Sequence, residues 1–341
     1  MRASLFAVFE SAFYDWRVAG RVDLGVWRTP LEPAPRLAER IGLQSGDLWV
    51  KRDDWLGLGG GGNKVRKLEF LCAQAIEQGA RTLVTTGAAQ SNYARLTAAA
   101  ARRLGMDVVL VLEGDGSGTS TGNLTLDGLL GAEIHWAGPC ARSELDDLAK
   151  EIAEELRASG RQPALMPYGG SNALGARGYL ECAEELAEQA PDARHVIVAV
   201  GSGATMAGLL AGLGAERVLG VDAGAVPDAE MRVRAIADEL IASESTLHRL
   251  SGSLRFSGEQ VGAGYEQLTD EALQAMRDAA RCEGLVLDPV YTAKAMAGLV
   301  AAVGSGEISP GERTVFVHTG GLPGLFGHPV AEQLAGEARS R

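Results

Sequence analysis

The sequence predicts an α/β protein whose mainly parallel sheets are covered by helices. Short apolar runs rich in β-branched residues alternate with longer helical patterns through most of the 341 residues. Most of these runs contain several consecutive apolar residues, as in strands that are buried on both faces of a parallel sheet. Such a sheet needs helices on both sides. A chain of this length can form two domains, and we expect two sheets rather than one.

The expected strands and helices alternate in order along the chain. The strands are TLVTT (82–86), DVVLVL (107–112), AEIHWA (132–137), PALMPY (163–168), HVIVAV (195–200), RVLGVDA (217–223) and TVFVHT (314–319). The longer helical patterns between or after them are 90–105, 143–158, 173–189, 227–241, 269–283 and 292–303. Ligands bind at the carboxyl ends of parallel strands, so the residues that follow each strand are the first candidates for a site.

Composition limits the functions that the protein can have. The net charge of −12 disfavours a nucleic-acid partner, because phosphate binding needs a basic face. The four cysteines are widely spaced with no C-x-x-C pair, so we expect neither a metal site nor a disulfide framework. The sequence has no run of about 18 apolar residues, the length that could span a membrane. The first 16 residues lack the pattern of a signal peptide. We expect a soluble, cytoplasmic protein.

A glycine-rich loop carries the first candidate residue. Residues 59–70 read GGGGNKVRKLEF, in which Lys64 opens an amphipathic helical pattern. A P-loop needs Ser or Thr directly after its lysine to reach magnesium, but Val65 follows Lys64. No apolar strand runs into the glycines, which also disfavours a dinucleotide-binding fingerprint. On this stretch alone, Lys64 could be a solvated surface charge or a covalent catalyst.

Four further clusters combine small and polar residues near expected strand or helix ends. They contain Ser91 and Asn92, the turn GSGATMAG (201–208), Tyr291, and Thr319. Ser91 could simply cap a helix, and residues 201–205 could be a plain tight turn. Taken together, the clusters offer an anion cradle without a magnesium ligand, a lysine on a loop, an asparagine and several hydroxyls. Pyridoxal phosphate, which is bound covalently to a lysine, uses this whole set.

Seven motifs resemble, in order and spacing, those of one pyridoxal-phosphate family. They are KRDD, GGNKVRKLE, GAAQSNYAR, GGSNALGARGY, GSGATMAGL, DPVYTAKAMAGL and HTGGLPGLFG. The family comprises D-cysteine desulfhydrase, 1-aminocyclopropane-1-carboxylate deaminase and L-cysteate sulfo-lyase, and it has the fold of the tryptophan synthase β chain (fold type II). The resemblance implies a homodimer of two-domain chains. We place the large domain at 1–65 and 176–341 and the small domain at 66–175.

The resemblance also implies roles for residues of this chain. Lys64 would carry the cofactor as a Schiff base, with Lys67 near its phosphate. Asn92 would bind the ring oxygen, and Thr319 would meet the ring nitrogen. The phosphate loop would comprise Gly201, Ser202, Gly203, Ala204 and Thr205. The catalytic residues besides Lys64 would be Ser91, Tyr265 and Tyr291, and the substrate would contact Ser91, Asn92, Tyr93 and Tyr291.

Two threonines indicate which reaction of the family to expect. The cyclopropane deaminases have a glutamate after DPVY and a leucine before the last double glycine, where this chain has Thr292 and Thr319. A carboxylate keeps the pyridine nitrogen protonated, and opening a cyclopropane without an α-hydrogen needs that strong electron sink. A hydroxyl suffices when an acidic α-proton and a good β leaving group are present. We therefore expect α,β-elimination of a D-cysteine-like amino acid to pyruvate, ammonia and a group such as sulfide.

Alternatives remain open from the sequence. Tyr93 and Leu96 depart from the family pattern, and Tyr93 could reshape the substrate pocket, so the natural substrate and its stereochemistry are not fixed. Cyclopropane deamination and L-cysteate desulfonation remain possible reactions. A non-catalytic phosphate-binding protein would keep the cradle but has no use for the lysine. A serine hydrolase built on Ser91 would need a G-x-S-x-G elbow, which is missing.

Overall fold

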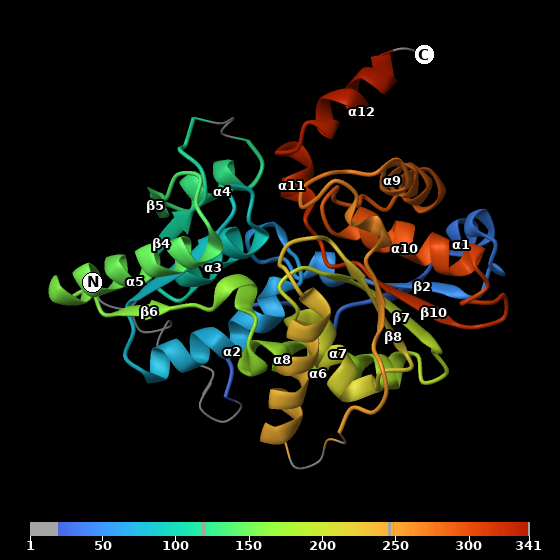
Figure 1. Cartoon of the computed structure of the whole chain (residues 1–341), viewed down its shortest axis with the longest axis horizontal. Helices are drawn as coiled ribbons and strands as arrows, with labels where there is room; N and C mark the ends of the chain where they lie inside the picture. Colours follow the sequence, from blue (N-terminus) through green and yellow to red (C-terminus); the bar gives the residue numbers. More distant parts are fainter. Residues whose placement is uncertain (1–19, 118–120, 245–246, 248, 340–341) are drawn as a thin grey trace, which may run out of the picture.

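Two separate sheets organise the chain (Figure 1). The computed structural model describes residues 20–117, 121–244, 247 and 249–339. The first 16 residues, in which we expect no signal peptide, lie outside the described residues. The larger sheet has six strands in the order β1 (Leu31–Pro33), β2 (Leu48–Lys51), β10 (Thr314–Val317), β7 (His195–Val200), β8 (Val218–Asp222) and β9 (Arg255–Ser257). Every pair is parallel except β1 with β2.

The smaller sheet comes from one continuous part of the chain. Its order is β5 (Glu133–Trp136), β4 (Asp107–Leu112), β3 (Thr82–Gly87) and β6 (Pro163–Leu165), and all its pairs are parallel. The predicted α/β class with mainly parallel sheets is confirmed. The strand expected at 163–168 ends early, at Leu165, because Pro167 precedes a tight turn at 168–170.

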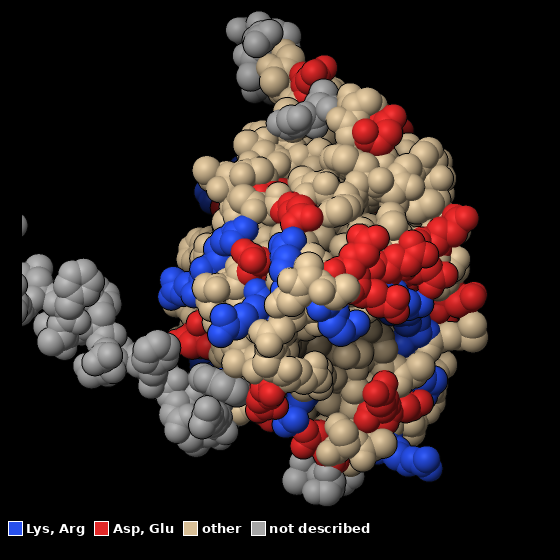
Figure 2. Space-filling model, turned by 90° about the vertical axis from the view of Figure 1, so that its left-hand side faces the viewer, with Lys and Arg blue, Asp and Glu red and all other residues tan. Residues whose placement is uncertain are grey.

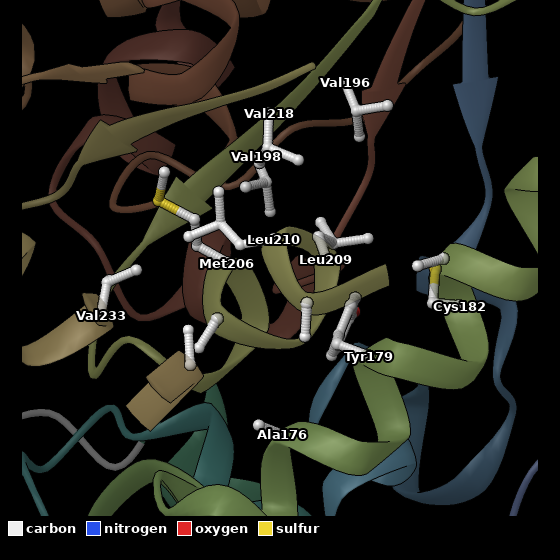
Figure 3. Packing of buried hydrophobic residues seen from close by; sticks show 14 of the residues in the cluster. Ala176, Tyr179, Cys182, Val196, Val198, Met206, Leu209, Leu210, Val218 and Val233 are labelled. Atoms are coloured by element: carbon white, nitrogen blue, oxygen red, sulfur yellow. The ribbon is translucent and has the colours of Figure 1, made fainter. Parts of the chain in front are cut away.

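Helices cover both faces of the larger sheet because its strands are apolar on both sides. In β7, Val196, Val198 and Val200 face one way, toward α6 (Ala173–Gln189), α7 (Ala204–Leu213) and α8 (Ala229–Ser243). The alternate residues Ile197 and Ala199 face α1 (Pro35–Ile41), α9 (Asp270–Glu283) and α10 (Thr292–Gly304). Figure 3 shows the first of these cores, with strand valines lying over the leucines of α7.

The smaller sheet is covered in the same way. Leu83 and Leu110 pack against α2 (Lys64–Glu77) and α3 (Asn92–Arg103), while Val84 and Val109 pack against α5 (Arg142–Ala158). Figure 2 shows the side of the molecule on which α5 lies, where acidic and basic side chains are interspersed. The remaining helices are α4 (Asn123–Leu129), α11 (Leu322–Phe326) and α12 (Val330–Arg339), and α12 stands away from the main body (Figure 1). None of the described helices is both long and apolar enough to cross a membrane.

Glycines let three helices approach one another closely. A Cβ atom at Gly178 of α6 would lie 2.3 Å from the carbonyl oxygen of Arg66 in α2. A Cβ atom at Gly208 of α7 would lie 2.2 Å from the carbonyl oxygen of Ala176 in α6. Only glycine fits at these two positions. The consequence is that α2, which begins with Lys64, is held at a fixed distance from α7.

A buried ionic network ties α2 to the larger sheet. The guanidinium group of Arg66 donates to both carboxylate oxygens of Asp53 and to both of Glu185, with Nε–Oδ2 at 2.9 Å and Nη1–Oε1 at 2.8 Å. Tyr179 donates to Asp53 at 2.6 Å, and Lys51 donates to Glu185. Burial raises the pKa of Asp53, but the charge and hydrogen bonds of Arg66, together with Tyr179 and Lys51, outweigh it and leave that pKa below its usual 3.8. Two cations therefore balance two anions in the interior.

The first prediction concerns this network. Arg66→Met should lower the free energy of unfolding by about 3–5 kcal/mol, because it leaves two buried carboxylates without their partner. Urea denaturation measures the change. Lys150→Met is the control, since it removes an exposed pair with Asp147 and should leave stability nearly unchanged. If the two variants proved equally stable, the network would not be what holds α2.

Candidate active site

Two adjoining pockets lie where the carboxyl ends of the strands of both sheets converge. The first, which we call the loop pocket, is lined by residues 201–203, Thr205, Thr319 and Gly320, among others. The second, the tyrosine pocket, is lined by Ser91, Tyr93, Tyr168, Ala225 and Tyr265, among others. Lys64, Asn92, Ser202 and Tyr291 line both pockets.

The structure brings together most of the residues that the sequence singled out. Only two of the predicted site residues, Lys67 and Ala204, line neither pocket. Ala204 is completely buried, and its amide donates to Ser171 Oγ. The side chain of Lys67 is also completely buried and lies behind the loop, with Nζ 3.3 Å from the carbonyl oxygen of Gly169 and 3.5 Å from Ser171 Oγ. Ser171, whose hydroxyl also contacts Ser202 Oγ, is one group that links Lys67 to the loop pocket.

Lys64 is the first residue of α2 and faces both pockets. The helix start is fixed because the amide of Asn63 donates to the carbonyl oxygen of Thr319 at 2.9 Å. The glycines before it turn the chain sharply, with φ of 75° at Gly61 and 120° at Gly62. Burial lowers the pKa of Lys64 from 10.5 to about 8, and the interaction with Lys67 opposes this only partly. An amine with this pKa is about one-tenth neutral at pH 7, a far larger share than for a lysine with the ordinary pKa of 10.5, so it can act as a nucleophile.

Residues 201–205, where the sequence predicts an anion cradle, lie at the start of α7. The first turn of a helix exposes amide groups that have no partner within the helix, and these attract anions. Gly203 has a φ of 107°, which favours glycine. Ser202 Oγ lies 2.6 Å from Ser171 Oγ, and Asn63 Nδ2 donates to Thr205 Oγ1 at 3.1 Å. The hydroxyls of the cradle are thus fixed by residues from outside it.

Ser91 and Asn92 stand at the start of α3. The hydroxyl oxygen of Ser91 accepts from the amide of Ala94 at 3.1 Å, so Ser91 is also the helix cap that the sequence allowed. The side-chain oxygen of Asn92 accepts from Asn123 Nδ2 at 3.0 Å and from Arg95 at 3.5 Å. This orients the amide so that its NH₂ group is left to donate into the pocket.

Tyrosines dominate the second pocket. The hydroxyls of Tyr265 and Tyr291 lie 2.6 Å apart. Burial raises the pKa of both phenols, and the negative charge of an ionised Tyr291 would raise that of Tyr265 further, so both stay protonated near neutral pH. Tyr168 completes the wall, with the guanidinium carbon of Arg142 stacked 3.4 Å from its ring centre. Tyr93 contributes to the wall from within the hydrophobic core and is only 2% exposed.

The two threonines that distinguish the reactions have different surroundings. Thr319 lines the loop pocket. Thr292 is completely buried and lines neither pocket. Its hydroxyl donates to Asp288 Oδ1 at 2.6 Å and accepts from the amide of Asp288 at 2.7 Å. Of the two, only Thr319 is placed to meet a group bound in the loop pocket.

Comparison with known proteins now settles the family. The model of the family described as pyridoxal-phosphate dependent enzymes matches residues 22–320. The chain belongs to this family.

Among the relatives, a D-cysteine desulfhydrase of Klebsiella pneumoniae is 40% identical over 330 residues, covering 91% of this chain and 96% of that protein. A protein of Pyrococcus horikoshii, provisionally named a 1-aminocyclopropane-1-carboxylate deaminase, is 39% identical over 312 residues, covering 90% of this chain and 93% of its own length. A crystal structure described as an ACC deaminase homologue has a TM-score of 0.83 at 36% identity and covers 93% of this chain and 95% of its own. The fold is therefore that of the fold type II pyridoxal-phosphate enzymes.

The pockets fit the cofactor of this pyridoxal-phosphate family. The loop pocket offers a lysine amine with a lowered pKa, an amide cradle for a phosphate and, at Asn92, an oriented NH₂ group. A side chain at Gly201 would crowd the wall of the loop pocket, because a Cβ atom there would lie only 3.0 Å from the ring of Tyr291. Lys64 would hold the group covalently, and residues 201–205 would hold its phosphate.

Sequence reasoning missed three residues of this site. Asn63 fixes Thr205, Ser171 fixes Ser202, and Tyr168 lines the substrate side. Tyr168 follows the end of β6, so the rule that sites lie at strand ends would have found it had the strand been ended at Leu165. Asn63 carried the simplest signal, since it is the residue directly before Lys64.

The second prediction follows from the pKa of Lys64. When pyridoxal phosphate is added to the apoprotein, the rate of covalent attachment should rise with pH and level off above about 8, because only the neutral amine attacks the aldehyde. Stopped-flow absorbance measures the rate. Lys64→Ala should show no covalent step. A rate for the wild-type protein that keeps rising toward the ordinary lysine pKa of 10.5 would contradict the buried environment of Lys64.

Proposed function

We propose that the protein is a lyase that removes the α-proton and the β-substituent of a D-cysteine-like amino acid, releasing pyruvate, ammonia and a leaving group such as sulfide. One observation carries this proposal. Among the described residues, the loop pocket is lined by the hydroxyl-bearing Thr319 and by no aspartate or glutamate. A neutral partner for the ring nitrogen suits elimination better than ring opening.

The site residues support a division of labour for this reaction. When bound, the cofactor supplies the electron withdrawal that makes the α-proton acidic. Lys64, with its pKa near 8, can take that proton on Nζ. Ser91 and the Tyr265–Tyr291 pair face the same pocket as Lys64 and can donate hydrogen bonds to the substrate carboxylate. As the β-substituent leaves with its bonding electrons, a protonated phenol of this pair can supply a proton.

The other reactions of the family fit less well. Ring opening of the cyclopropane substrate would lack a carboxylate in the loop pocket. L-Cysteate desulfonation is the second elimination that the geometry allows, and the residues of the tyrosine pocket do not decide the leaving group. A protein that only binds a phosphate ligand would have no use for a lysine with a lowered pKa facing both pockets.

We also propose that the chain forms a homodimer of two-domain subunits in the cytoplasm. Each sheet has its own hydrophobic cores, which supports domains at 1–65 with 176–341 and at 66–175. All four cysteines are free, as is usual in a reducing compartment. Phe326 is 62% and Leu322 45% exposed on α11, beside an apolar groove between α9 and α12, and such patches are typical of subunit contacts.

The third prediction tests the reaction. The holoenzyme should release pyruvate and ammonia from at least one of D-cysteine, L-cysteine, D-serine, β-chloroalanine and cysteate, and no 2-oxobutanoate from 1-aminocyclopropane-1-carboxylate. Coupled dehydrogenase assays measure both products. Lys64→Ala should lower turnover by roughly three orders of magnitude or more. Thr319→Ser should keep elimination, whereas Thr319→Leu should weaken it. Robust release of 2-oxobutanoate by the wild-type enzyme would overturn the proposal.

The fourth prediction tests the assembly. Light scattering should give twice the chain mass of 35.6 kDa. Phe326→Asp should shift the protein toward the monomer, because it places a charge in the apolar patch on α11. Leu129→Asp is a matched control at a position that is 80% exposed on α4, and it should leave the mass unchanged. A wild-type protein that is monomeric at micromolar concentration would rule the dimer out.

A further inference from the structure

Lys294 lies close to the site but lines neither pocket. It belongs to the first turn of α10, three residues after Tyr291, and its side chain is completely buried. A buried ammonium group is costly unless polar atoms surround it. Burial lowers the pKa of Lys294, and the charge of Asp222, which does not bond to it, opposes this only in part. The polar atoms that bind the Lys294 ammonium group must therefore come from other residues.

Three backbone carbonyl oxygens surround the Lys294 ammonium. Nζ lies 3.2 Å from the oxygen of Ala223, 3.0 Å from that of Val261 and 3.1 Å from that of Gly264. These acceptors use all three protons of the group. They come from two segments, the residue after β8 and the loop 258–268, so one side chain of α10 holds both.

Both segments carry a wall of the tyrosine pocket. Gly264 directly precedes Tyr265, and Ala223 lies two residues before Ala225. Beyond one 3₁₀ turn at Glu259–Val261, the loop has two backbone hydrogen bonds of its own: the amides of Gly264 and Gln267 donate to Val261 and Gly264, at 3.3 Å each. The acceptors of these two bonds are the same oxygens that Lys294 holds. Without a cation, the negative ends of three carbonyl dipoles would face one another and repel.

We propose that Lys294 is a positioning residue whose ammonium group serves as an internal cation. It fixes loop 258–268 against the end of β8, which places the hydroxyl of Tyr265 within reach of that of Tyr291. Carbonyl oxygens gathered at one point are also ligands that K⁺ and NH₄⁺ accept. When the lysine side chain is removed, a monovalent cation should occupy the same point and restore the loop.

Hydrogen exchange of the holoenzyme tests this directly, with the peptide that spans residues 259–267 as the readout. Lys294→Ala in tetramethylammonium chloride, whose cation is too large to enter, should exchange roughly tenfold or more faster than the wild-type protein. KCl or NH₄Cl at equal ionic strength should return the protection. Lys294→Met fills the space without a charge, so it should exchange fast in every salt. Met296→Ala, which removes a buried side chain from the same helix, should respond to no cation.

The outcomes separate cleanly. Loop protection that is unchanged in both Lys294 variants overturns the proposal, and so does fast exchange in Lys294→Ala that K⁺ and NH₄⁺ leave unaltered. If Lys294→Ala folds only with K⁺ or NH₄⁺ present, the proposal is supported. If Lys294→Ala folds in no salt, the Lys294→Met variant decides. Fast exchange of the loop in an otherwise protected Lys294→Met protein supports the role of Lys294, and wild-type protection of the loop refutes it.

Turnover gives a second readout that rests on the proposed function. The loss caused by Lys294→Met should be smaller in a Tyr265→Phe background, because Lys294 acts through that hydroxyl. The exchange readout needs no substrate. A failure of the proposed elimination would therefore not count against Lys294, and an intact loop in the variants would refute its role whatever the substrate.

Discussion

The position of Lys64 depends on the ion pairs that the buried guanidinium of Arg66 forms with Asp53 and Glu185. Arg66 lies two residues after Lys64 in α2 and binds one carboxylate from the turn after β2 and another from α6. Because every group in this network is paired, a shift of the helix start would leave several buried charges unsatisfied at once. Lys64 itself has no such partner. The first turn of α2 thus holds two basic groups: the Arg66 guanidinium, whose charge is paired, and the Lys64 amine, which burial keeps partly neutral.

The polar groups of the site are mostly neutral donors. Asn92 presents an NH₂ group, Tyr265 and Tyr291 remain protonated, and residues 201–205 offer backbone amides. Such groups bind the charges of a phosphate and a carboxylate without introducing opposing fixed charges. They also stay in the same protonation state over a wide pH range. Among the described residues that line the loop pocket, Lys64 is then the one group that titrates near neutral pH.

Much of the fold and of the site could be predicted, because apolar runs mark buried parallel strands and ligands bind at their ends. That rule alone led to Ser91, residues 201–205 and Thr319. It failed at Tyr168, because PALMPY was interpreted as a strand to its last residue. The sequence also assigned Thr292 equal weight in choosing the reaction, but the hydroxyl of Thr292 donates to Asp288, four residues before it, and the residue lines neither pocket. It also gave no sign of the partners of Lys67, because Gly169 and Ser171 lie 102 and 104 residues away in sequence.

The order of strands in the larger sheet has a consequence for biosynthesis. β10, whose residues are 314–317, lies between β2 and β7, near the middle of the sheet, although the ribosome makes it after every other strand. Residues 82–165 can form their own parallel sheet early, but β2 and β7 must wait with open edges. Thr319 is the second residue after β10, so the loop pocket closes only in that last step. A nascent chain that stalls late would be a partly folded species with exposed strand edges, which chaperones recognise.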